Sequence, residues 1–297
     1  MHARSLDAAA LVVLALLACA RAARADDAAA ATASVPASET APRAPSLERV
    51  RRIDRTAYTL DPLQVGVGVE SVEFAPLAEL TLGTYVPTWV LSPVLGTPVP
   101  TAFVKARTPF SGPVLASVRV NLVYLNATSL HSELAQATTV NGSLWIVPIE
   151  LALSADISQR LSESLELMYL AIRGSANADG TATIRGSAAA DGVTLSSFSE
   201  LRMSRSFSLT LLARVLVHAD AARVQGSSSS NGTNLDFNLG VRRRNAFVAC
   251  VVPGVELDLG RAHLDLGLGY GSWWLPIVEL PLASYGLVPE ANAFVRF

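Results

Sequence analysis

Apolar side chains alternate with small or polar ones along several stretches of this 297-residue chain, and this period of two restricts its fold more than any other feature. A period of two places alternate side chains on opposite faces of a β-strand. The stretches run to roughly 9–13 residues, whereas strands of soluble proteins cluster near five or six and a tilted membrane-crossing strand needs about nine to eleven. The clearest stretches are 113–125, 144–153, 206–218, 234–242 and 263–271.

The composition limits what such strands can build. The chain is 51% apolar and 16% charged, whereas a soluble domain averages about 25% charged residues. Its longest apolar run, 8–20, falls short of the roughly 18 residues that a membrane helix needs. A soluble β-sandwich and a membrane-spanning β-barrel remain. Leu, Val and aromatic residues dominate one face of each stretch, which favours the barrel because the outer face of a sandwich is richly charged.

We therefore expect an antiparallel up-and-down transmembrane β-barrel over 57–297, with about 12 strands in a range of roughly 10–14. The predicted strands are 64–73, 77–88, 100–108, 113–126, 143–154, 161–173, 192–203, 206–219, 233–243, 246–259, 262–272 and 288–297. Short turns and long polar loops should lie at opposite ends of such a barrel. Strict alternation puts the two longest Ser/Gly loops at the short-turn end, unless 233–243 is an excursion of an outer loop and an additional strand precedes residue 64.

Four long polar connections are predicted as outer loops, at 126–142, 174–192, 226–233 and 272–286. A repeat lies in one of them, where IRGSANADG at 172–180 recurs as IRGSAAADG at 184–192. Two copies cannot form a solenoid. The repeat is either a flexible loop or a strand extension with Asp-Gly turns above the barrel.

The N-terminal region predicts export. Arg4, the apolar stretch 8–17 and the pattern Ala23-Arg24-Ala25 are typical of a secretory signal peptide over 1–25 that is cleaved before Asp26. As an alternative, Leu16-Leu17-Ala18-Cys19 resembles a relaxed lipobox and would lipidate Cys19.

Two expectations concern the mature chain. Residues 26–56 are rich in Ala, Pro, Ser and Thr, which predicts a flexible periplasmic leader. Cys250 is the one cysteine that remains after cleavage, so no intrachain disulfide can form. A buried, inert thiol is expected for it.

The C-terminal residues resemble a known family. The chain ends Ala293-Phe-Val295-Arg-Phe297, and Val295 and Phe297 match the signature that the barrel-assembly machinery reads in outer-membrane proteins. The stretches Val65-Gly-Val-Gly-Val69 and Leu80-Thr-Leu-Gly-Thr84 are also similar to uncharacterised outer-membrane barrels of Gram-negative bacteria. The resemblance implies this fold and location and an encounter with that machinery. It implies no solute.

Alternation places several charged residues in the lumen and an aromatic group at one strand end. The aromatic residues Tyr270, Trp273 and Trp274 are expected to form a girdle at head-group depth. Acidic residues outnumber basic ones inside, which favours cations in any open path. Side chains fill most of a barrel of this size, so we expect a plugged or very narrow lumen. The predicted lumen-lining residues are Arg119, Glu150, Glu166, Arg214, Glu256, Asp258 and Asp265.

No motif predicts catalysis, a cofactor or a metal. The chain lacks paired-Cys and His-x-x-His spacing, a Gly-x-Ser-x-Gly elbow and a nucleotide-binding loop, and its net charge of −2 excludes a basic field for nucleic acid. We expect a non-enzymatic outer-membrane barrel, either a narrow channel or a surface scaffold, with lipid as a partner and small solutes possible. The alternatives are a hydrolase at the outer rim, with His218 near Asp220, and a secreted β-sandwich binding protein. The sequence leaves the oligomeric state open.

Overall fold

The computed structural model describes residues 55–95, 98–109, 114–126, 139–179, 183–219, 223–230, 233–240, 248–275 and 280–297. Helix α2 spans Val86–Leu95, and among the described residues no helix has the length and apolar character needed to cross a membrane. The strands are β1 (Val65–Gly68), β2 (Ser71–Leu77), β3 (Leu80–Tyr85), β4 (Thr101–Arg107), β5 (Val114–Asn126), β6 (Thr139–Asp156), β7 (Leu161–Asp179), β8 (Thr183–Arg202), β9 (Phe207–Ala219), β10 (Arg223–Ser230), β11 (Thr233–Gly240), β12 (Ala249–Leu259), β13 (Ala262–Leu275) and β14 (Leu280–Arg296).

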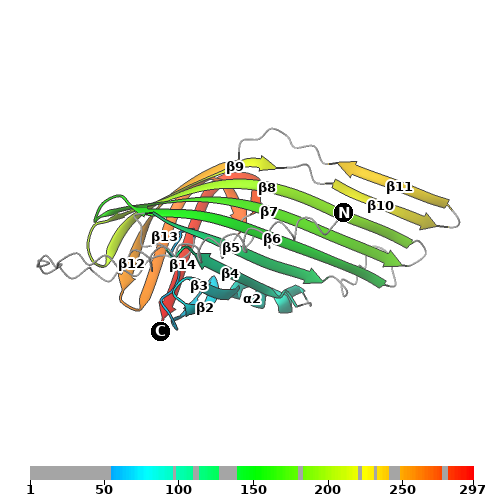
Figure 1. Ribbon diagram of the computed structural model, residues 1–297. Coiled ribbons are helices and arrows are strands. Elements are labelled where there is room, and N and C mark those ends of the chain that lie inside the picture. Colours follow the sequence, from blue (N-terminus) through cyan, green and yellow to red (C-terminus); the bar gives the residue numbers. More distant parts are fainter. Residues whose placement is uncertain are drawn as a thin grey trace, which may run out of the picture.

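Twelve of the described strands close into an antiparallel barrel (Figure 1). Consecutive strands from β1 to β9 pair in order, β9 pairs with β12, and β12–β14 lead back to β1. Closure matters because an open sheet leaves two edges of unpaired backbone groups. The predicted fold class and the count of twelve strands are confirmed.

Strands β10 and β11 are not part of the barrel wall. They form a hairpin that pairs with residues 183–189 of β8, beyond the point where β8 leaves β9 (Figure 1). Over its described residues, 233–240, the predicted strand 233–243 therefore lies outside the wall, as the excursion alternative states. The second part of that alternative, an additional strand before residue 64, does not contribute to the described wall, because the predicted strand 64–73 divides at Val69 and Glu70 into β1 and β2.

Two of the four predicted outer loops are shorter than expected, and most of a third, 126–142, lies outside the described residues. Most of 174–192 forms the ends of β7 and β8, and most of 272–286 extends β13 and β14. The two repeat copies pair with one another across the β7–β8 hairpin, with Arg173 opposite Ala189 and Ser175 opposite Ser187. The strand extension is thus the correct interpretation of the repeat, but Asp191 and Gly192 lie within β8 and not in a turn. Gly180 of the other Asp-Gly pair lies outside the described residues. Small polar residues form strands here because each neighbouring strand supplies hydrogen-bond partners for their backbone groups.

The two faces of the wall have opposite chemistry, as the alternation predicts. On β6, Trp145, Leu151 and Leu153 are exposed, whereas Ile146 and Glu150 are buried. A closed single-layer barrel has one interior, so the buried face of each strand points into it. The interior contains many Ser, Thr and charged side chains, and the exposed face carries the large apolar ones. Cys250 is buried on β12, as expected.

Candidate functional site in the barrel interior

A non-strand segment, Arg55 to Leu60, lies inside the barrel and is its most informative interior feature. Ala57 is fully buried and Leu60 is 2% exposed. The ammonium group of Lys105 on β4 donates to the carbonyl oxygen of Thr56 at 2.6 Å. The backbone N–H of Ala57 donates to Oγ of Ser154 on β6 at 2.7 Å. We call residues 55–60 the internal segment.

Further contacts tie the internal segment to other parts of the wall. The backbone N–H of Leu60 donates to Oγ1 of Thr81 on β3 at 3.3 Å. At its other end, Arg55 forms an ion pair with Glu290 on β14. The internal segment therefore connects strands on different sides of the barrel and occupies space that would otherwise be open. Arg55 and Thr56, which the sequence assigned to the leader, belong to this segment; residues 26–54 lie outside the described residues.

A buried polar cluster surrounds Arg119 on β5. Its guanidinium group donates to the Tyr85 hydroxyl at 2.9 Å and lies 4.0 Å from the centre of the Phe103 ring. Glu150 accepts a hydrogen bond from the Asn121 amide, and its second oxygen lies 3.9 Å from Arg119. The cation is thus held by an aromatic face and a carboxylate together, which offsets the cost of removing it from water.

A second charged region lies where β12, β13, β14 and β1 meet. The imidazole Nε2 of His263 lies 3.0 Å from a carboxylate oxygen of Glu256. The His263 ring stacks on Phe294 at 4.4 Å, and the Arg296 guanidinium carbon lies 4.7 Å from the centre of the same Phe294 ring. Asp265 is buried on the strand that carries His263.

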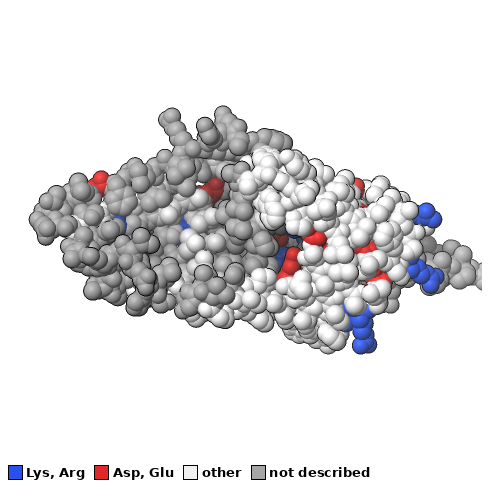
Figure 2. Space-filling model, turned by 180° about the vertical axis from the view of Figure 1, so that it is seen from behind, with Lys and Arg blue, Asp and Glu red and all other residues white. Residues whose placement is uncertain are grey.

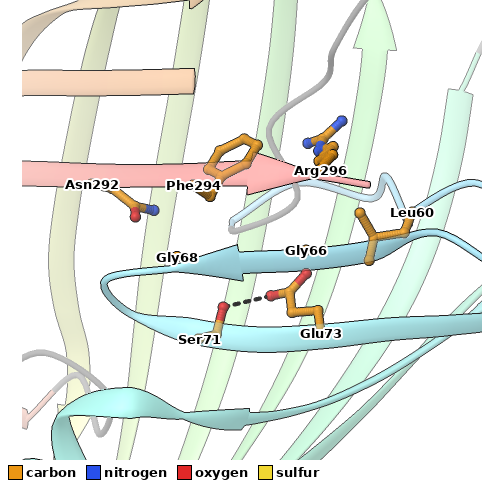
Figure 3. A pocket seen from close by; sticks show the side chains of 8 residues that line it. All are labelled: Leu60, Gly66, Gly68, Ser71, Glu73, Asn292, Phe294 and Arg296. Atoms are coloured by element: carbon orange, nitrogen blue, oxygen red, sulfur yellow. Dashed lines mark hydrogen bonds between the residues drawn. The ribbon is translucent and has the colours of Figure 1, made fainter. Parts of the chain in front are cut away.

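A pocket adjoins this charged region (Figure 3). Its empty volume is about 330 Å³, part of it open to solvent. The Glu73 carboxylate accepts a hydrogen bond from the Ser71 hydroxyl at 2.8 Å within it. Leu60 of the internal segment lies over Gly66 at one side of the pocket. The lining residues are Leu60, Gly66, Gly68, Ser71, Glu73, Asn292, Phe294 and Arg296.

The structure places most predicted lumen residues in the interior clusters. Asp258 differs, because it is only half-buried and accepts a hydrogen bond from the backbone N–H of Gly260 at the β12–β13 turn. The others are buried at between 2% and 9% exposure: Arg119, Glu150, Glu166, Arg214, Glu256 and Asp265.

Sequence reasoning missed three buried charged or titratable residues. His263 shares the inward face of Asp265 two residues later, so the alternation could have identified it. Lys105, the single lysine of the chain, shares the inward face with Phe103 on β4. Glu73 escaped notice because the strand break at Val69 and Glu70 was not foreseen.

The predicted aromatic girdle divides between the two faces. Tyr270 is 66% and Trp273 is 41% exposed. Trp274 instead points inward, where its ring lies 5.0 Å from the Arg214 guanidinium and packs against the cluster that contains Phe198 and Val288. Neighbouring residues point to opposite faces, and the irregular register between Ser272 and Trp274 adds a local change of direction.

The C-terminal residues complete the closure of the barrel. The backbone N–H of Phe297 donates to the Val65 carbonyl oxygen at 2.9 Å, and the N–H of Val65 donates to the Phe297 carbonyl oxygen at 3.2 Å. The Phe297 side chain is 67% exposed, and Val295 lies on the same face, opposite Val67. Recognition by assembly factors stays a prediction for both residues.

The hydrolase alternative depends on His218 and Asp220 lying close together. His218 is exposed near the end of β9, and Asp220 lies outside the described residues. In the described part of the chain, no group of three or more His, Cys, Asp or Glu side chains is arranged to hold a metal ion.

Comparisons with known proteins give similarity only at the level of architecture. No protein-family model and no curated protein sequence matches the chain. The crystal structure of the P. putida toluene transporter TodX is 10% identical, with 80% of this chain and 68% of that chain covered and a TM-score of 0.43. The Ralstonia pickettii toluene transporter TbuX is 9% identical, with 76% and 68% covered and a TM-score of 0.36. The CymD monoaromatic hydrocarbon channel is 8% identical, with 80% and 89% covered and a TM-score of 0.37. The fold assigned here depends on the strand pairing of this chain itself.

Proposed function

We propose that this protein is a non-catalytic outer-membrane β-barrel with a narrow, cation-preferring path that the internal segment closes. The observation that carries the proposal is the inverted distribution of side chains: a charged interior that holds a buried chain segment, inside a wall whose outer face is apolar. An apolar exterior is unfavourable in water, whereas it is required for contact with the hydrocarbon core of a membrane.

The outer face of β7 supports insertion in a membrane. Leu165 and Leu167 are exposed on it. Towards one end of the strand, Glu163 accepts a hydrogen bond from Ser199, and towards the other, Arg173 pairs with Asp191. Ten residues separate Glu163 from Arg173, so a strand with a rise of about 3.3 Å per residue and a tilt of about 45° gives a band about 23 Å tall. This agrees with the apolar band of about 25 Å in outer-membrane barrels.

The charge balance supports the cation preference. Among the described residues, six buried carboxylates face four buried Lys and Arg side chains. The carboxylates belong to Glu73, Glu150, Glu166, Glu200, Glu256 and Asp265, and the bases to Lys105, Arg119, Arg214 and Arg296. A path between these groups would carry a negative potential and attract cations over anions.

The location is proposed from the barrel, the expected signal peptide and the terminal Phe297. Mass spectrometry of the mature protein should find an N-terminus at Asp26. An acylated N-terminus at Cys19 would contradict the simple signal peptide.

Planar-bilayer recording tests the channel function. The wild-type barrel is expected to conduct rarely. The double variant Lys105→Met with Ser154→Ala loses two groups that hold the internal segment, so frequent potassium-selective openings are expected. Glu150→Gln with Glu166→Gln, in the background of that double variant, should lower the potassium-to-chloride ratio.

Arg173→Gln is the matched control, because Arg173 lies on the outer face and touches no interior group in the described chain. Porin-scale conductance in wild-type protein would contradict closure by the internal segment. Passage of an uncharged apolar solute such as toluene in place of potassium would contradict the proposed solute class.

The second candidate function, a surface scaffold, is favoured by one feature, the sheet of β6–β8 with β10–β11 that continues beyond the barrel (Figure 1). Removal of 220–247 should leave heat-modifiable migration and conductance unchanged if this sheet serves attachment. A loss of conductance on its removal would instead assign it to the channel.

A further inference from the structure

Three short turns at the C-terminal end of the barrel carry an exposed apolar side chain followed within three residues by an exposed arginine, whereas the β2–β3 turn at the same end has exposed Leu77 followed by Glu79. Three turns carry these pairs: Ile157 with Arg160 between β6 and β7, Met203 with Arg205 between β8 and β9, and Leu259 with Arg261 between β12 and β13. The apolar members are 63%, 55% and 70% exposed, in the same order. We call these residues the rim pairs.

The rim arginines differ from other arginines of the barrel in their electrostatic partners. Arg119 interacts with Glu150 inside, and Arg173 forms a bidentate pair with Asp191 on the outer wall. In the described part of the chain, the guanidinium groups of Arg160, Arg205 and Arg261 make no ion pair. Figure 2 shows basic side chains projecting from the end of the barrel opposite the strand extension.

Each rim pair has two halves with opposite solvation needs. The apolar half gains free energy by leaving water for hydrocarbon, and the guanidinium half needs water or an anion. Guanidinium is planar, weakly hydrated and able to bind phosphate through two N–H donors. Both needs are met together only at the boundary between acyl chains and phosphate groups.

We propose that the rim pairs bind the phosphate head groups of anionic phospholipids in the leaflet at the C-terminal end of the barrel. The apolar side chains favour lipid over a water-soluble acidic polymer, because a polymer would leave Ile157, Met203 and Leu259 in water. This inference rests on the membrane insertion in the proposed function and is independent of conduction.

Lipid retention by the full-length barrel folded in detergent micelles tests the inference. Native mass spectrometry would compare dioleoyl phosphatidylglycerol with dioleoyl phosphatidylcholine. The wild-type protein should prefer phosphatidylglycerol, and the triple variant Arg160→Gln, Arg205→Gln, Arg261→Gln should lose that preference by about tenfold or more, since each basic residue near an anionic surface contributes about fivefold.

Two further triple variants distinguish the contribution of the arginine charge from that of the apolar contact with lipid. Replacement of the same arginines by Lys should keep most of the preference, because the charge remains. Replacement of Ile157, Met203 and Leu259 by Ser should weaken retention of both lipids. Arg185→Gln is the control, because Arg185 is exposed on β8 beyond the barrel, where β8 pairs with β10.

Specific outcomes would overturn the inference. An unchanged preference in the triple Gln variant would exclude the arginines as the binding groups. Arginine-dependent binding of soluble peptidoglycan fragments that the Ser variant retains would assign the rim to an acidic polymer. Heat-modifiable migration shows whether each variant folds. If the triple Gln variant does not fold, the single variant Arg261→Gln is measured in its place. A barrel that fails to insert into a bilayer contradicts the proposed function, whereas an inserted barrel without lipid preference contradicts only this inference.

Discussion

The barrel wall consists of two unequal regions. Strands β6, β7 and β8 are 18, 19 and 20 residues long, whereas β1, β2 and β3 are 4, 7 and 6 residues long. In the first region nearly every residue of β7 pairs with both neighbours. In the second, the β1–β14 ladder covers 66–68 and is flanked by backbone hydrogen bonds between Val65 and Phe297 and from Val69 to Ala293. The internal segment contacts this region from inside the barrel.

The two regions are therefore stabilised by different interactions. The long region depends on backbone ladders, so it accepts the small residues of the duplicated repeat. The short region depends on close side-chain packing, because its short strands form few backbone hydrogen bonds. Gly83 on β3 illustrates this: an added Cβ would lie 2.2 Å from Cζ of Phe103.

The largest expected loss of stability comes from placing a charge on the outer face, and it should differ between the two regions because they lie at different membrane depths. Leu167 on β7 and Val67 on β1 are 42% and 43% exposed on the outer face. Leu167 lies near the middle of the apolar band, whereas Val67 pairs with Val295 close to the C-terminal end. Leu167→Arg should lower the free energy of unfolding by about 2–4 kcal/mol and Val67→Arg by about 1 kcal/mol or less. Denaturant titration in lipid bilayers measures both. Equal costs would contradict the depth assigned to the two strands.

A smaller effect compares glycines in the two regions. Gly83→Ala brings its Cβ too close to both the Phe103 ring and the Val72 carbonyl oxygen, so it should cost about 1–3 kcal/mol. Gly192→Ala on β8 meets its nearest atom, the His218 carbonyl oxygen, at 3.6 Å and should be near neutral. The midpoint of guanidinium denaturation checks the pair. A destabilised Gly192→Ala protein with a stable Gly83→Ala protein would reverse the comparison.

The smallest effect concerns the outer surface of the long region. Arg173 and Asp191 form a partly exposed ion pair that the Tyr169 hydroxyl joins at 2.8 Å. Solvent screens such pairs, so Arg173→Gln should cost about 1 kcal/mol or less. Thermal unfolding at low and high salt measures the cost. A loss above about 2 kcal/mol would mean that this ion pair, rather than the backbone ladder, holds the far end of the region.

Much of the wall could be predicted because alternation is a local property. The outward position of Leu266 and the inward position of Asp265 follow from the period of two along one strand, whichever strand lies beside it. Trp274 was misplaced because the irregular register beside Ser272 depends on β14, which lies elsewhere in the sequence. The repeat could not be assigned because Ser, Gly and Ala have weak intrinsic preferences and take the structure of their neighbours.

The alternation along the chain is enough to predict a barrel of about 12 strands with an apolar exterior and charged interior positions. What fills that interior depends on contacts that form only in the folded barrel. The contacts of the internal segment join residues far apart in the chain, from Thr56 to Lys105 and from Ala57 to Ser154. No periodicity encodes such contacts, because they exist only after closure brings β4 and β6 around the segment. The pairing that makes β1–β3 short and β6–β8 long is decided in the same way, since register depends on both partners of a ladder.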